Sequence, residues 1–119
     1  MCSCFIIPPS FHLDSCVHLC KRYLGNFYHN LWHGADVCFT TWRLLHDTKC
    51  VEWMTQVEVF AALVAAYGHD VGHPGVGNPF LVQTGSDLAL LHNDHSPLEN
   101  MHAAILAGVR AMVQRSTAA

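Results

Sequence analysis

Histidine and aspartate side chains that could bind a metal ion are concentrated in two short stretches of the sequence. The first, "YHNLWHGADV", carries His29 and His33, which on a helix share one face with Cβ atoms about 5–6 Å apart. The second, "YGHDVGHPGVGNPF", carries His69, Asp70 and His73. Imidazole suits a borderline ion such as zinc, and a carboxylate can bridge to a harder ion such as magnesium or manganese. The two stretches together predict a two-metal site.

A two-metal site of this composition suits hydrolysis of a phosphate ester. Two cations lower the pKa of a bridging water, hold the phosphate and neutralise charge in the transition state. A nearby histidine that binds no metal can protonate the departing alkoxide, which contributes about 10²–10⁴-fold in rate. The competing interpretation is ordinary surface or core histidines, because the chain has ten of them and an H-x-x-x-H pair alone is a weak signal.

The elements that position these residues are predicted to be helices. The apolar periodicity indicates helices over residues 13–24, 28–45, 54–68 and 79–84. Segment 54–68 is mostly apolar, which predicts a buried core helix with His69 and Asp70 at its end. Glycines and prolines then let the backbone bend tightly around His73. No alternating pattern of useful length indicates a strand, so the predicted fold class is all-α.

A capping box predicts where the last helix begins. Ser96 supplies a cap serine, Pro97 lies at the first helical position and Glu99 lies at the third. The helix is expected to continue through Met112. Capping alone is therefore enough to explain Glu99, although a chemical role is compatible with it.

Length and composition fit one small domain and narrow the classes of function. The chain has 119 residues and a net charge of -3 without a block of like charge, so nucleic-acid binding is not expected. The longest apolar stretch, "VFAALVAAYG", is well short of the roughly 20 residues that span a bilayer. The six cysteines form no C-x-x-C pair, and no signal peptide is evident, so we expect reduced thiols and a cytoplasmic location. Broad apolar helix faces suggest a piece of something larger.

The two stretches also resemble a known family, the class I 3′,5′-cyclic-nucleotide phosphodiesterases. "HDVGHPGVGNPF" is similar to that family's H-D-[aliphatic]-x-H-x-G-x-x-N-x-[apolar] signature, and "YHNLWHGADV" to its Y-H-N-x-x-H-A-x-D-V block. "FLVQTGSDLALLHNDHSPLENMHAA" resembles a third block, which ends in L-E-N-H-H. The resemblance covers about residues 11–113. It implies that residues 1–119 form an incomplete, multi-helix catalytic domain of the HD type.

The resemblance implies roles for individual residues. His29 would be the general acid that protonates the O3′ leaving group. Three residues would ligate the first metal, which is zinc in the family: His33, His69 and Asp70. Asp70 would also bridge to a second metal, usually magnesium (or manganese), while His73 and Glu99 would hold metal-bound water. The reaction would open the cyclic phosphate of cAMP or cGMP to a 5′-monophosphate.

Some positions depart from the family pattern. Gly34 stands where the family prefers alanine, at a cost to the helix of about 1 kcal/mol, and Met101 replaces the first histidine of L-E-N-H-H. His102 occupies the second histidine position and is interpreted as an ordinary histidine, while Asn78 is interpreted as a loop-organising residue. The family's domain continues beyond this chain, with a second aspartate ligand and the purine pocket. We therefore expect an enzyme by family and a poorly active or inactive piece, whose substrate-binding residues are unassigned.

Two alternatives stay open. Another HD-superfamily metal phosphohydrolase, such as a nucleotidase, would share the His…His-Asp core without requiring the Y-H-N block. A non-catalytic fragment that binds metal or pairs with a partner is the second. Tests of cyclic nucleotides against nucleoside mono- and triphosphates would separate the enzymes.

Overall fold

The computed structural model describes residues 16–116, and every element in that range is helical. Residues 16–20 form a short helical segment. The elements that follow are α2 (Leu31–Asp47), η1 (Cys50–Trp53), α3 (Gln56–Gly68), α4 (Asn78–Gln83), α5 (Asp87–Leu91) and α6 (Pro97–Ser116). The prediction of an all-α fold is confirmed. No helix within 16–116 is long and apolar enough to cross a membrane.

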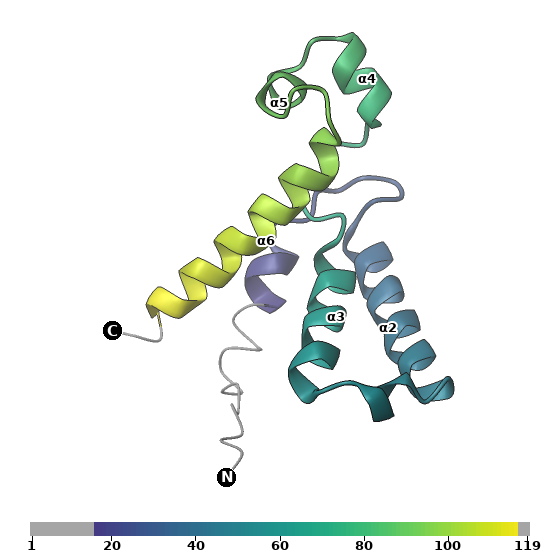
Figure 1. Ribbon diagram of the computed structural model, residues 1–119. Coiled ribbons are helices and arrows are strands. Elements are labelled where there is room, and N and C mark those ends of the chain that lie inside the picture. Colours follow the sequence, from purple (N-terminus) through teal and green to yellow (C-terminus); the bar gives the residue numbers. More distant parts are fainter. Residues whose placement is uncertain (1–15, 117–119) are drawn as a thin grey trace.

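Helices α2 and α3 pack side by side as a hairpin joined by η1 (Figure 1). Each begins at a side-chain cap that satisfies otherwise unpaired backbone N–H groups. The Asn30 side chain accepts hydrogen bonds from the backbone N–H groups of Trp32 and His33. Thr55 and Glu58 form a reciprocal capping box at the start of α3. These local hydrogen bonds set the residues at which α2 and α3 begin.

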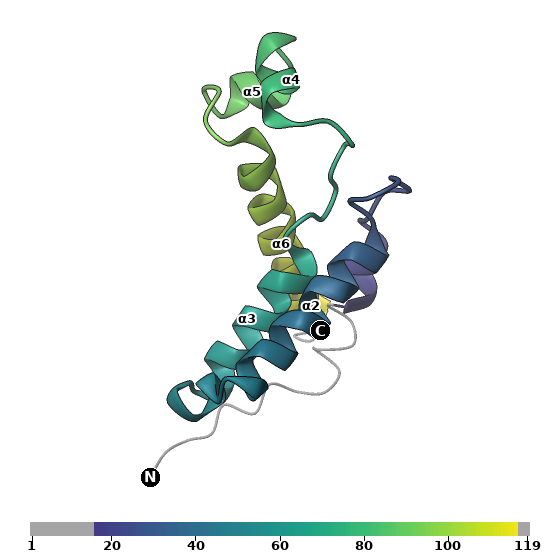
Figure 2. The ribbon, with the colours of Figure 1, turned by 90° about the vertical axis from the view of Figure 1, so that its right-hand side faces the viewer.

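Helix α6 runs past the end of α3, while α4 and α5 lie at its N-terminal end (Figures 1 and 2). Two small apolar clusters hold this arrangement together. The first cluster joins the segment 16–20, the residues directly after α3, and α6. It consists of Leu19, Val71 and Val109, with Tyr67 and Ile105 packed against them. The second consists of buried residues of α4, α5 and α6: Leu81, Ala89 and Leu98. One part of the core thus lies where α3 ends and α6 passes, and the other lies between α4, α5 and the start of α6.

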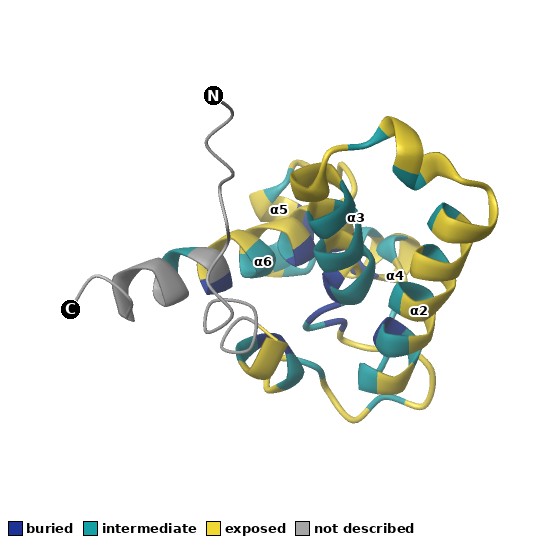
Figure 3. Ribbon diagram, turned by 90° about the horizontal axis from the view of Figure 1, so that it is seen from below, coloured by how far each residue is buried: buried dark blue, intermediate teal, exposed yellow. Residues whose placement is uncertain are grey.

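The first and third expected helices differ from the structure. Of the helix predicted over 13–24, residues 13–15 lie outside the described part, and the helical segment ends at residue 20, before Gly25. The prediction that α3 is a buried core helix is wrong, since Gly68 is its one buried residue and Val57 is 52% exposed. Residues 56–58, 61 and 65 are exposed, and the rest of α3 apart from Gly68 is half-buried (Figure 3).

The start of α6 also differs from the predicted capping box. Ser96 has a left-handed backbone, with φ at 45°, and no hydrogen bond of the described residues joins its hydroxyl to Glu99. Instead, the Asn78 side-chain oxygen accepts from the Leu98 N–H at 3.0 Å, and its amide donates to Glu99 Oε2 at 2.9 Å. Asn78 therefore supplies the cap from the start of α4, twenty residues earlier, and links the two helices.

Candidate metal centre

Asp70 lies at the centre of a group of side chains able to bind a metal ion. His33 comes from the first turn of α2, and His69 and Asp70 follow α3 directly. The Nε2 atoms of His33 and His69 lie 3.3 and 3.0 Å from Asp70 Oδ2. Ligand atoms of all three lie within 4.8 Å of one another. Residues 36 positions apart in the chain thus converge on one carboxylate oxygen.

The ring orientation of His69 suits metal binding. Its Nδ1 lies 2.8 Å from the carbonyl oxygen of Ala66. A carbonyl oxygen can only accept, so Nδ1 carries the proton and the neutral ring presents an unprotonated Nε2. This backbone partner fixes the tautomer that a histidine ligand needs.

The three atoms fit a catalytic zinc site in type and spacing. Two nitrogens and one carboxylate oxygen form a common protein ligand set for catalytic zinc. Two atoms each about 2.1 Å from one tetrahedral ion lie about 3.4 Å apart, close to the 3.0 and 3.3 Å separations around Asp70. A small adjustment of rotamers would admit the ion. The residues present therefore fit the metal that the sequence motif implies.

His29 lies beside this group. Its ring stacks on that of His73, with centroids 3.9 Å apart and planes 6° apart, and is edge-on to His33 at 6.1 Å. No hydrogen bond or ion pair of the described residues joins His29 to Asp70. The His29 ring therefore lies near the possible metal ligands without bonding to Asp70, which leaves it available as a proton donor.

His73 is buried, with 6% of its surface exposed. Its Nδ1 accepts a hydrogen bond from the Gly75 N–H at 3.0 Å, so the neutral ring carries its proton on Nε2. Burial lowers the pKa of His73, and repulsion from a charged His29 lowers it further. His73 is thus held as a neutral ring whose Nε2–H can donate to a bound water.

Glu99 belongs to neither group of possible ligands around Asp70. Its side chain is exposed on α6 and bonded to Asn78. This hydrogen bond holds the pKa of Glu99 below its usual range. The structure brings five of the six predicted site residues together and leaves Glu99 outside both groups of possible ligands.

Two residues that contribute to the site were not predicted from the sequence. Asn26 donates to the carbonyl oxygens of His29 at 3.2 Å and of His73 at 2.6 Å, and so ties the two stacked histidines together. Buried His102 forms a second possible ligand group with Asp70 and His73. The position of His102 in the L-E-N-H-H block was the available signal. Nothing local indicated Asn26, which lies 47 residues from His73.

Helices α2 and α3 pack closely beside the candidate metal ligands. A Cβ atom on Gly34 would lie 2.9 Å from the Tyr67 carbonyl oxygen and would also meet the Tyr23 hydroxyl. That hydroxyl donates to the same carbonyl at 2.5 Å. Burial, with a contribution from Asp70, raises the pKa of Tyr23 to about 12, so the hydroxyl stays protonated. Glycine at position 34 therefore lets α2 pack closely against α3. This packing explains why a residue of low helix propensity stands in the middle of the contact.

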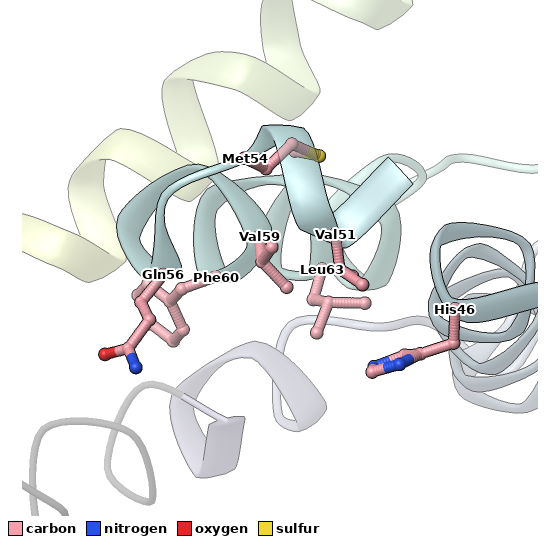
Figure 4. A pocket seen from close by; sticks show the side chains of 7 residues that line it. All are labelled: His46, Val51, Met54, Gln56, Val59, Phe60 and Leu63. Carbon is pink, nitrogen blue, oxygen red and sulfur yellow. The ribbon is translucent and has the colours of Figure 1, made fainter. Parts of the chain in front are cut away.

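An apolar pocket lies at the other end of the hairpin (Figure 4). Its volume is about 380 Å³, and its lining residues are His46, Val51, Met54, Gln56, Val59, Phe60 and Leu63. None of the predicted site residues lines it. The candidate chemistry and this pocket are therefore separate features.

A comparison with protein families decides the chain's ancestry. Residues 28–115 match the model of the 3'5'-cyclic nucleotide phosphodiesterase family. The chain belongs to this family. The resemblance noted in the sequence is thereby confirmed; the enzymes of this family are metal-dependent, and this chain has groups of residues that could bind a metal ion. The matched region contains all of the predicted site residues.

Similar proteins match only in part of their length. The chain is 49% identical over 77 residues to the dual specificity calcium/calmodulin-dependent 3',5'-cyclic nucleotide phosphodiesterase 1C of Mus musculus and of Homo sapiens. Each match covers 65% of this chain and 11% of the relative. The chain thus spans about a tenth of the length of these relatives.

Two solved structures share the fold of this phosphodiesterase chain. Both are phosphodiesterase domains of the rhodopsin phosphodiesterase of Salpingoeca rosetta, with TM-scores of 0.83 and 0.81 and identities of 35% and 36%. The matches cover 88% and 87% of this chain and 32% of each of those chains. The helices described above therefore correspond to about a third of such a domain.

Proposed function

We propose that residues 1–119 are part of the catalytic domain of a metal-dependent phosphodiesterase that hydrolyses 3′,5′-cyclic nucleotides, cAMP or cGMP, to 5′-monophosphates. Family membership and the convergence of His33, His69 and Asp70 beside His29 support this proposal. The convergence is the observation on which it depends, because a shared cation needs all three atoms within reach of one point. A cytoplasmic location belongs to the same proposal.

The roles in this mechanism follow from position. His33, His69 and Asp70 would hold Zn²⁺, and Asp70 would extend to Mg²⁺ or Mn²⁺. Bound cations would supply a hydroxide nucleophile at neutral pH and neutralise charge on the phosphate.

The remaining candidates act through protons. His29 would donate its proton to the O3′ atom as that atom leaves, and the stacked His73 ring and Asn26 would hold His29 in place. His73 would donate through Nε2 to bound water, since its Nδ1 is already an acceptor. Glu99 would reach the same water after a change of its side-chain rotamer.

We further propose that this chain hydrolyses cyclic nucleotides slowly or not at all. Positioning of the substrate can account for about 7–11 kcal/mol of a barrier, and among residues 16–116 the pocket observed is remote from Asp70. Turnover of cAMP or cGMP by the purified chain, abolished by His29→Ala, would contradict this part of the proposal.

Zinc content after dialysis tests the site directly. We expect the purified chain to retain zinc, Asp70→Asn to lose it, and Asp87→Asn, a matched change at an exposed aspartate of α5, to retain it. Asparagine preserves the size of Asp70 and removes the charge that a cation needs. Equal zinc in all three proteins, or none in any, would contradict the proposed metal site. Circular dichroism of each protein checks that it is folded.

A further inference from the structure

Cysteines from two separate segments contact neighbouring turns of α3. Cys20 Sγ, in the short segment 16–20, lies 2.9 Å from the Tyr67 hydroxyl oxygen. The Cys38 thiol, in α2, donates to the carbonyl oxygen of Leu63 at 3.5 Å. Leu63 and Tyr67 are one helical turn apart and therefore share a face of α3. Because aromatic side chains of a helix point back toward its N-terminus, the Tyr67 ring brings the Cys20 sulfur toward the turn where Cys38 lies.

A third cysteine, Cys16, belongs to the same group. It precedes Cys20 by one turn of the helical segment 16–20, a spacing that puts both on one face with Cβ atoms about 5–6 Å apart. Burial raises the pKa of Cys16, and repulsion from Cys20 raises it further. Burial also raises the pKa of Cys38, with a further contribution from Cys16. Repulsion of this kind weakens with distance, so Cys16 lies near both of the other thiols.

This thiol group is separate from the candidate metal centre and is free to bind a ligand. No disulfide joins any of the four cysteines within residues 16–116. Neither group of possible ligands around Asp70 includes a cysteine, and the proposed mechanism uses none. In a reducing compartment, such as the cytoplasmic location proposed above, grouped cysteines are more typical of metal binding than of disulfides.

We propose that Cys16, Cys20 and Cys38 bind one soft divalent cation of the zinc type through their sulfur atoms. Sulfur ligands favour such ions over Mg²⁺ or Ca²⁺, and three cysteines with one further ligand are a common zinc ligand set. Each thiol releases its proton to solvent as its sulfur bonds to the cation, because the thiolate is the ligand.

The bound cation would tie the segment 16–20 to α2 across one face of α3. With metal–sulfur bonds of about 2.3 Å in tetrahedral geometry, the sulfurs lie about 3.8 Å apart, so the three side chains rotate inward on binding. Cys38 then gives up the proton that it donates to Leu63. This site goes beyond the proposed function and does not depend on Asp70.

Cadmium is the probe, because Cd–thiolate bonds give an ultraviolet charge-transfer absorption that nitrogen and oxygen ligands do not give. We expect the reduced 119-residue chain, titrated with Cd²⁺ alone, to show this absorption with one ion per chain. Loss of a partner outside the coordination sphere already costs about 10–100-fold in affinity, so Cys16→Ser and Cys38→Ser should each weaken binding at least about 10-fold. Cys50→Ser, at an exposed cysteine of η1, is the matched control and should bind as the wild type does.

Alkylation of the wild type gives a second measurement that needs no substitution. With Cd²⁺ bound, iodoacetamide should label the three proposed ligands more slowly, while Cys50 reacts at its usual rate. Tandem mass spectrometry identifies the labelled positions. Circular dichroism shows whether each variant is folded.

The outcomes separate this site from the proposed catalytic one. Cadmium absorption that is unchanged in Cys16→Ser and Cys38→Ser, or labelling of the three cysteines that Cd²⁺ does not alter, would show that they are packing residues only and overturn the proposal. Asp70→Asn should keep the absorption. A chain that binds Cd²⁺ at its thiols but retains no zinc at Asp70 would contradict the proposed function and leave the thiol site intact.

Discussion

The two ends of the α2–α3 hairpin differ in what they bury. At the site end, Gly34 and Gly68 are buried, and α3 passes beside α6 and the segment 16–20. At the opposite end, Trp53 is 89% exposed and Leu44 is 58% exposed. Large apolar side chains are exposed at the site end too, where Trp32 is 80% exposed, so the two ends differ in their buried residues and not in their exposed ones.

This difference shows that the site depends on a small core. The metal-binding candidates lie where segments distant in sequence cross, and Leu19, Val71 and Val109 are the fully buried apolar residues at that crossing. Loss of packing there should disturb the folded state and the position of Asp70 together. Changes at the opposite end should be felt much less.

The largest effect is expected from Leu19→Ala, because Leu19 is 2% exposed. Removal of a buried leucine side chain costs about 2–5 kcal/mol. Leu44→Ala makes the same chemical change at the exposed end and should stay within about 0.5 kcal/mol of the wild type. Urea unfolding followed by circular dichroism measures both. Similar losses in the two variants would remove the contrast between the ends.

A smaller loss is expected from Gly34→Ala. The added methyl group gains about 1 kcal/mol in helix propensity but overpacks the contact with Tyr23 and Tyr67, which costs about 1–3 kcal/mol. We expect a net destabilisation of about 0–2 kcal/mol, measured by thermal or urea unfolding. Gly108→Ala is the matched control in α6, where a Cβ atom meets nothing within 4 Å. A stabilised Gly34→Ala variant would show that α2 is not held as closely as described.

The capping box at the opposite end should contribute about 1 kcal/mol. Thr55→Ala removes the side chain that accepts from Glu58 N–H at 3.3 Å, and the loss of such a cap typically costs that amount. Thr40→Ala, an exposed change within α2, should be nearly neutral. An effect of Thr55→Ala as large as that of Leu19→Ala would mean that the hairpin end is as important to folding as the crossing.

The smallest effect concerns the link between α4 and α6. The hydrogen bond from Asn78 lowers the pKa of Glu99, so the stability it adds is present above the unfolded pKa of about 4.3 and is lost as pH falls through the folded value. Exposure to solvent limits the effect to less than about 0.5 kcal/mol. Unfolding free energies between pH 6 and pH 3 should fall slightly more for the wild type than for Glu99→Gln, and identical slopes would contradict the prediction.

Prediction from the sequence worked where the interactions are local. The helix over 28–45 corresponds to α2, because Asn30 caps the N–H groups two and three residues ahead. The sequence likewise predicted that His69 and Asp70 directly follow a helix, and α3 ends at Gly68. The capping box at Ser96 failed although its residues fit the pattern, since a distant Asn78 competes for the same helix end.

The sequence by itself determined the all-α class, the family and the pairs of histidine and aspartate residues that lie within one turn of each other, because these depend on neighbours a few positions apart. Only the tertiary structure decided that His33 reaches Asp70, that Asn26 joins His29 to His73, and that buried His102 faces the second oxygen of Asp70. Apart from the bond between Asn26 and His29, those contacts join residues 32 to 47 positions apart. Such residues come together because the apolar faces of the helices pack against one another where the helices cross.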